Sequence, residues 1–440
     1  MGYGSGRLPI ERASKLGHMQ LIEHEHVQRL LRQFQAVEPR DGTAVGARSG
    51  HLDLSTPPSL DYVLTVDGGQ ALIPNELRRD KRMAFIKIGA MVIRREDVEA
   101  LRARPVIDPR DLKAMFEGGT WTTSAALPLA GISLPGETVK STIRKTVDAV
   151  LEYTKLYEVL NYLVSRQWDP GYEMDPNRNS DAPHMACLEC GHQVYLPKSA
   201  INFECSFCNE PHRLSDYLGI GEESPDDWSR EEAAMSLRNS LETLTLFHFI
   251  IRTWQRTPAL LSRTLFLKDG PLLLRAQLSR LVEPLRALIE RIHADEQPLH
   301  IVGIEKNGEL VEHIEEIKKH LPEIGDYFLP SVQYLYEEIG GRVFNPRTFR
   351  DRVRYGAKLV VRIGPNHVVP MDIPTVGVQL TPQINDLLGV LESARLLSSM
   401  TSYAHDNALI PIKLANSLSS ISERPSGDIL RAFAGQLFNS

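Results

Sequence analysis

Short apolar runs alternate along the chain with longer segments of helical periodicity. Strands are predicted where β-branched and aromatic residues cluster, at residues 61–69, 84–93, 264–270, 299–306, 358–364 and 367–373. Helices are predicted where apolar residues recur every three or four positions, at about 11–34, 138–167, 271–292, 307–320 and 381–398. A further helix, with Ser224 or Asp226 as its N-cap, ends near Trp254. Strands that alternate with helices predict a mixed α/β layer architecture.

Irregular stretches divide the chain into four parts. Residues 169–183 carry three prolines and break the regular pattern just before all the cysteines. We expect an N-terminal helical arm at 1–57, a first core segment at 58–180, a cysteine module at 181–223 and a second core segment at 224–440.

The composition excludes some classes of protein. The net charge is −6, so any contact with nucleic acid must come from a local basic patch. No apolar run approaches the roughly 20 residues that span a bilayer, and the N-terminus lacks the apolar core of a secretory signal. We therefore expect a cytoplasmic protein with no membrane contact.

The chain's four cysteines form two Cys-x-x-Cys pairs, Cys187 with Cys190 and Cys205 with Cys208. Each pair makes a tight turn that places two thiolates on one side, and two such turns supply the four soft ligands of tetrahedral Zn²⁺. Redox cysteines and an iron–sulfur cluster are the alternatives. Such a zinc ribbon would brace the fold, dock a partner or contact nucleic acid. Four cysteines already complete the coordination shell of the metal. The nearby His184, His192 and His212 are therefore expected to be neighbours of the ligands or surface groups, not ligands.

Two aspartates follow apolar strand segments and precede glycines. They are Asp67 in VDGG and Asp269 in KDGPL. The pattern predicts carboxylates at the C-terminal ends of adjacent strands, where a glycine turns the chain. Carboxylates in that position can share Mg²⁺ or Mn²⁺ ions, which activate water for phosphodiester cleavage. The alternative is an ordinary Asp-Gly turn.

The order of the segments VDGG, FLKDGPLLL, IVGIEK and IPIKLAN resembles that of the NurA nucleases, over about residues 60–425. The resemblance implies an RNase H-like mixed sheet flanked by helices, here with a zinc ribbon inserted. It also implies a manganese-dependent DNA nuclease that forms a homodimer. Its expected partner is a hexameric HerA-type ATPase, and its expected role is DNA end processing or antiphage defence.

The resemblance further implies roles for particular residues. Asp67, Glu242 and Asp269 would hold Mn²⁺ or Mg²⁺, and Lys306 would hold the scissile phosphate. Asn416 stands where the family has a histidine, and asparagine cannot shuttle a proton near neutral pH. His405, close in sequence, is a candidate substitute. The family's tyrosine position is occupied here by Ala408.

Two other functions stay open at this point. A catalytically impaired adaptor or clamp for the ATPase would explain the missing histidine. A zinc-ribbon nucleic-acid binder without a motor partner would need local basic segments. Three exist, at 77–82, 94–96 and 347–358, and the last holds four arginines and a lysine.

Overall fold

The computed structural model describes residues 22–33, 45, 48–74, 81–102, 119–198, 201–220, 231–401, 409–421 and 430. They belong to two compact units, residues 1–43 and 44–440. In the first unit, helix α2 (Glu25–Gln33) confirms part of the helix predicted at 11–34, whose residues 11–21 and 34 lie outside the described ones. Every helix among the described residues is too short or too polar to cross a bilayer.

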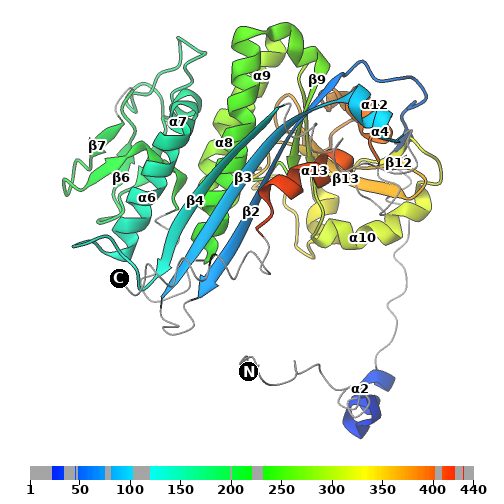
Figure 1. The fold of residues 1–440 in the computed structure, drawn as a ribbon, viewed down its shortest axis with the longest axis horizontal. Helices are drawn as coiled ribbons and strands as arrows, with labels where there is room; N and C mark the ends of the chain where they lie inside the picture. Colours follow the sequence, from blue (N-terminus) through cyan, green and yellow to red (C-terminus); the bar gives the residue numbers. More distant parts are fainter. Residues whose placement is uncertain are drawn as a thin grey trace. The chain divides into compact units, whose positions relative to one another are not determined.

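A large mixed sheet forms the centre of the second unit (Figure 1). Its described strands are, in spatial order, β1 (Ser49–His51), β11 (Asp326–Phe328), β12 (Ala357–Gly364), β13 (His367–Ile373), β10 (His300–Ile304), β9 (Thr264–Asp269), β2 (Tyr62–Pro74), β3 (Arg82–Arg94) and β4 (Thr120–Ala130). Strand β9 is parallel to both β2 and β10, whereas the other neighbouring strands are antiparallel.

Five of these strands, in the order β4-β3-β2-β9-β10, form an RNase H-like core. The antiparallel meander β2-β3-β4 comes first in the chain, and the parallel strands β9 and β10 continue the sheet from β2. The antiparallel strands β13, β12, β11 and β1 extend it further. The predicted fold, an RNase H-like mixed sheet built from two chain segments with an inserted ribbon, is confirmed.

Strand β2 differs from its prediction in one respect. It continues for seven residues beyond Asp67 and pairs with β3 along its whole length. The sequence predicted that a glycine turns the chain after Asp67, but Gly68 and Gly69 both lie within β2. In contrast, β9 ends at Asp269, and Gly270 has a φ of 119°, so the predicted turn is present there.

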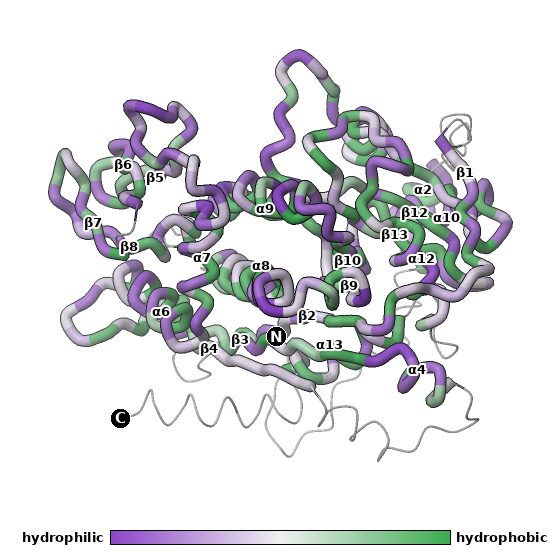
Figure 2. The backbone as a smooth tube through the Cα atoms, turned by 90° about the horizontal axis from the view of Figure 1, so that it is seen from above, coloured by the Kyte–Doolittle hydropathy of each residue, from purple (hydrophilic) through white to green (hydrophobic). Residues whose placement is uncertain are grey.

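Helices cover both faces of the sheet. On one face the main apolar core joins β2, β3, β4 and β9 to α6 (Val139–Thr154), α7 (Leu156–Val164), α8 (Glu231–Arg256) and α9 (Val282–Ala294). On the other face a second core contains α4 (Arg95–Arg102), α12 (Val390–Ser399) and α13 (Ile410–Ser419). Figure 2 shows α8 and α13 on opposite sides of β2. Helix α10 (Glu309–Ile317) packs in a smaller core with β11, β12 and β13.

Several predicted helices are shorter or interrupted. The helix predicted at 138–167 is divided by Lys155, whose φ of 62° is left-handed. The one predicted at 271–292 begins with an irregular segment, followed by the 3₁₀ helix η3 (Ala276–Leu281) and α9. Other short turns are η1 (Leu214–Leu218), η2 (Pro258–Arg263), η4 (Lys318–His320), α11 (Val332–Tyr334), η5 (Leu335–Ile339) and η6 (Ile384–Asp386). Helix α8, which the sequence did not assign to the sheet, packs directly on β2, β3 and β9.

Candidate active site and metal centre

The four cysteines lie on two β-hairpins, β5 (His184–Ala186) with β6 (Gln193–Tyr195) and β7 (Asn202–Glu204) with β8 (Pro211–Arg213). The two turns share one backbone pattern. The N–H of the first cysteine donates to the carbonyl five residues later, at 2.7 Å for Cys187 and 2.9 Å for Cys205. The residue four positions on donates back to that cysteine and has positive φ, 74° at Gly191 and 60° at Asn209. These are two equivalent knuckles facing one another.

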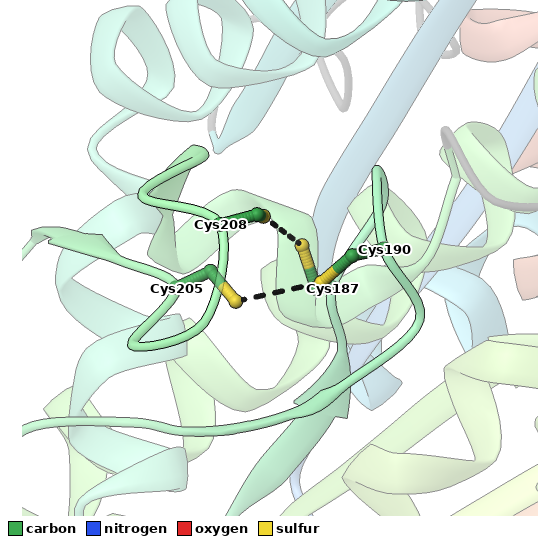
Figure 3. Close-up of side chains that lie close together, drawn as sticks. All are labelled: Cys187, Cys190, Cys205 and Cys208. Carbon is green, nitrogen blue, oxygen red and sulfur yellow. Dashed lines mark hydrogen bonds between the residues drawn. The ribbon is translucent and has the colours of Figure 1, made fainter.

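The sulfur atoms are spaced for a single tetrahedral ion (Figure 3). The distance from Cys187 Sγ to Cys208 Sγ is 3.6 Å, and that from Cys190 Sγ to Cys205 Sγ is 3.7 Å. A zinc ion with Zn–S bonds of about 2.3 Å gives a tetrahedron edge of about 3.8 Å, whereas a disulfide is about 2.05 Å long. The four free thiols could therefore bind a metal such as zinc.

Backbone amides prepare Cys187 for that role. Burial raises the pKa of its thiol, but hydrogen bonds from the N–H groups of Cys190 and Glu189 and from His212 outweigh burial and lower it to about 6. The thiolate is the metal-binding form of cysteine. His212 is buried, with Nε2 3.3 Å from Cys187 Sγ. His192 instead stacks on the exposed ring of Phe207, with centroids 3.8 Å apart.

The ribbon is fixed to helix α6 by buried ion pairs. Arg144 donates to both carboxylate oxygens of Asp216, at 2.9 and 2.8 Å, and to Glu210 at 3.1 Å. Ser215 donates to Asp148 of α6 at 2.9 Å. Since Asp216 also lies 3.6 Å from His212, α6 connects to the cysteine cluster through two consecutive side chains.

Asp67 and Asp269 lie on the neighbouring parallel strands β2 and β9. Val66 pairs with Lys268, so each aspartate directly follows a paired residue. Adjacent strands are about 4.8 Å apart and successive side chains alternate between faces, so both aspartates leave the same face at the same level. Asp67 is 6% exposed and the side chain of Asp269 is 11% exposed. The structure thus brings together two carboxylates from opposite halves of the chain.

Glu242 approaches β2 from the opposite face, in the middle of α8. Its carboxylate lies over Gly68, where an added Cβ would be 2.4 Å from Glu242 Oε1. Its Oε2 is 3.1 Å from Lys268 Nζ, and its Oε1 is 3.5 Å from Arg238 Nε. Burial raises the pKa of Glu242, and the two cations only partly oppose this. Gly68 therefore provides the space that lets Glu242 reach the sheet beside Asp67.

Asp269 is the carboxylate with the most perturbed titration. Burial, followed by the negative charge of Asp67, raises its pKa to about 6, and Glu242 adds to the effect. Lys306 opposes the shift, because its Nζ lies 2.5 Å from Asp269 Oδ2. The side chain of Lys306 is 45% exposed, whereas that of Asp269 is 11% exposed. The site holds more negative charge than its lysines neutralise.

Helix α13 supplies a further partner for Asp67. The buried Ser419 donates from Oγ to Asp67 Oδ2 at 2.7 Å. A Cβ on Gly69 would lie 2.2 Å from the Ser419 carbonyl oxygen, so this glycine is needed for α13 to approach. Asn416, predicted at the site, is on the exposed side of α13, one turn before Ser419. His405 lies outside the described residues.

Sequence reasoning missed Lys268 and Ser419. A signal for Lys268 existed, because a lysine within the apolar strand FLKD must be paired if the strand is central to a sheet. Ser419 had no such signal, since it is one of several serines near the end of α13 and only the docking of that helix singles it out.

The carboxylates suit a hard cation by their chemistry. Oxygen donors are the ligands that Mg²⁺ and Mn²⁺ prefer, and Mg²⁺ commonly uses one or two carboxylates with water and phosphate. A cation between Asp67 and Asp269 would relieve the repulsion that raises the pKa of Asp269. Among the described residues, however, the four cysteines are the only group of three or more His, Cys, Asp or Glu whose ligand atoms all lie within 4.8 Å of one another, so Glu242 does not converge on the same point as the two aspartates.

Comparisons with known proteins give little beyond this geometry. No protein-family model matches the chain, and no curated protein shows a significant sequence match to it. A solved structure described as "Crystal structure of NurA" aligns over 97% of this chain and 98% of its own, with 12% sequence identity and a TM-score of 0.29. Similarity at that level establishes neither family nor activity.

Proposed function

We propose that this protein is a divalent-metal-dependent deoxyribonuclease that hydrolyses phosphodiester bonds. The observation that carries the proposal is a pair of aspartates, the buried Asp67 and the 11% exposed Asp269, on the same face of two adjacent parallel strands in an RNase H-like sheet. The negative charge of Asp67 contributes to the raised pKa of Asp269, and a divalent cation between the two carboxylates would relieve that repulsion.

Asp67 and Asp269 would hold Mn²⁺ or Mg²⁺, with Glu242 as a third acidic group. A divalent ion held there would supply the chemistry that activates water and stabilises the leaving oxygen. Ser419 orients Asp67 through its hydrogen bond. To bind the metal ion, Glu242 would have to break its ion pair with Lys268. Otherwise it would influence the site only through its negative charge, from the other side of β2.

Lys306 is proposed to hold the scissile phosphate. Its ammonium is half-exposed and touches Asp269 at the point where substrate would arrive. A phosphate next to Asp269 would compete for this ammonium as a point charge. Asn416 faces solvent, so any role for its amide would depend on substrate reaching that side of α13.

The wider assignments rest on the sequence resemblance to NurA nucleases. We propose a homodimer that acts on DNA with a HerA-type hexameric ATPase, in DNA end processing or antiphage defence. Zinc at the four cysteines would be structural, because the ribbon is held on α6 by the Arg144–Asp216 ion pair and the Ser215–Asp148 hydrogen bond.

An impaired adaptor or clamp subunit is the second candidate. It is favoured by the ion pairs that Asp269 and Glu242 already make with Lys306 and Lys268. The described part of α13 also carries no histidine, and Asn416 cannot transfer a proton near neutral pH. On this proposal the sheet and ribbon serve only to bind DNA and the motor.

Cleavage of labelled DNA with Mn²⁺, with and without the ATPase, separates the two. Asp67→Asn is the informative variant, because the amide keeps an oxygen that can accept from Ser419 but loses the charge. Asp61→Asn is the matched control, since Asp61 directly precedes β2 and pairs with Arg95 and Arg263 at its other end. If the protein is a nuclease, wild type and Asp61→Asn should cleave DNA and Asp67→Asn should not. Undiminished cleavage by Asp67→Asn removes the nuclease proposal, and no cleavage by wild type even with the motor supports the adaptor.

A further inference from the structure

A cluster of arginines lies on an irregular segment at residues 341–353, called here the arginine loop. Its exposed arginines are Arg342, Arg347, Arg350 and Arg352. Within the described chain none of the four forms an ion pair with a carboxylate, although exposed arginines elsewhere do, such as Arg252 with Glu158. The loop thus concentrates positive charge on a chain whose net charge is −6.

The loop has a defined shape despite lacking helix or strand. Phe349 packs at 5.1 Å from the Tyr336 ring and 5.2 Å from the Phe344 ring, centroid to centroid. The N–H of Phe349 donates to the Asn345 carbonyl at 2.9 Å. The three aromatic rings pack on one another in edge-on and tilted arrangements, and the arginine side chains of this turn are exposed.

The one acidic residue of the loop is occupied by anchoring it. Asp351 pairs with Arg354 at 2.9 Å and with Arg286 of α9 at 3.7 Å. Arg286 also donates to the Asp351 carbonyl at 2.8 Å. Asp351 therefore fixes the base of the loop to α9 and does not neutralise the exposed arginines.

The base of the loop also bonds to the segment that follows β9. Leu274 donates its N–H to the Val353 carbonyl at 2.8 Å, and Tyr355 donates to the Leu272 carbonyl at 3.0 Å. Four residues separate Asp269 from Leu274, so the chain between them spans at most about 18 Å.

We propose that the arginine loop binds the DNA backbone of the substrate. Guanidinium groups match phosphate in shape and charge. An acidic protein partner would be expected to bury aromatic anchors, but the aromatic rings of this loop pack on each other. The inference rests on the proposed function for its substrate, and it assigns the loop as the element that holds that substrate.

The test is a salt titration of DNA affinity. The triple variant Arg347→Gln, Arg350→Gln, Arg352→Gln is compared with a control on α8 and α9: Arg252→Gln, Arg256→Gln, Arg291→Gln. Fluorescence anisotropy of a labelled 30-base-pair duplex is followed in Mn²⁺-free and Mg²⁺-free buffer, so that cleavage plays no part. Each lost phosphate contact reduces the slope of log K against log salt by about 0.9, so the triple variant should lose about 2.7 in slope. The control should keep the wild-type slope.

The possible results separate this inference from the proposed function. A triple variant that binds with the wild-type slope overturns the role of the loop, even if wild type cleaves DNA with Mn²⁺. Loss of ATPase binding with unchanged DNA binding also overturns it, in favour of an acidic protein partner. A flattened slope in a protein that never cleaves DNA supports the loop and removes the nuclease proposal. Unchanged urea unfolding midpoints confirm that both variants are folded.

Discussion

Replacing Asp269 by asparagine should stabilise the protein, and increasingly so as the pH rises. The pKa of Asp269 is raised from 3.8 to about 6 by burial and by Asp67. The unfolded chain therefore loses this proton first, and the folded state carries the cost of ionising a buried carboxyl at higher pH. At 1.36 kcal/mol per pKa unit the full cost is about 3 kcal/mol above pH 6, and about 1.4 kcal/mol of it develops between pH 5 and pH 8.

Urea unfolding of wild type and Asp269→Asn from pH 5 to pH 8, in zinc-containing buffer without Mn²⁺ or Mg²⁺, measures this difference. The stability advantage of Asp269→Asn should grow by about 1.4 kcal/mol over that interval, because asparagine has no proton to lose. Asp61→Asn gives the baseline for removing a carboxylate from a more exposed position next to β2. Adding Mn²⁺ at pH 8 should stabilise wild type but not Asp269→Asn. A constant or shrinking advantage would refute the assignment of Asp269 as a strained buried carboxyl.

Three further predictions concern the neighbours of this site and the ribbon. Ser419→Ala should lower the free energy of unfolding by about 1.5–3 kcal/mol, measured by urea denaturation, because the buried Asp67 loses a hydrogen bond. Cys205→Ser should abolish stoichiometric zinc, measured by atomic absorption, and lower Tm, whereas retention of one zinc per chain would contradict the four-cysteine centre. Gly69→Ala should destabilise by about 1–3 kcal/mol through its clash with α13, while Gly119→Ala, whose Cβ meets only ordinary contacts, should stay near wild type in the same denaturation assay.

The central strands and helices could be predicted from sequence because their patterns are local. Strand β3 matches the predicted strand to within two residues at each end. Helix α8 ends two residues beyond its predicted end, and its predicted N-cap, Ser224 or Asp226, lies outside the described residues. Strand β4, in contrast, contains several threonines, serine and proline, and was missed because its burial depends on α6 packing over it. Helix α13 was missed for a similar reason, since its apolar face is evident only once it lies on β2 and β3.

The candidate sites show the same difference between features that depend on local sequence and features that depend on tertiary packing. The Cys-x-x-Cys spacing was enough to predict the metal-binding turns, because each turn is formed by a few consecutive residues. The meeting of Asp67 with Asp269 depends on pairing between distant strands, and only the order of segments suggested it. The placement of Glu242 on the opposite face of β2, over Gly68, follows from helix packing and could not be read from residue types.

The two glycines after Asp67 affect the order in which this region can form during synthesis. The space left by the missing side chain of Gly68 is filled by α8, which follows the ribbon in the chain. The space at Gly69 is filled by α13, which is made more than 300 residues after β2. A nascent chain released up to β9 would have both aspartates on adjacent strands, but Asp67 would still lack its hydroxyl partner and be open to water on that face. Asp67 therefore gains its hydroxyl partner late, only after α13 has been made and has packed against β2.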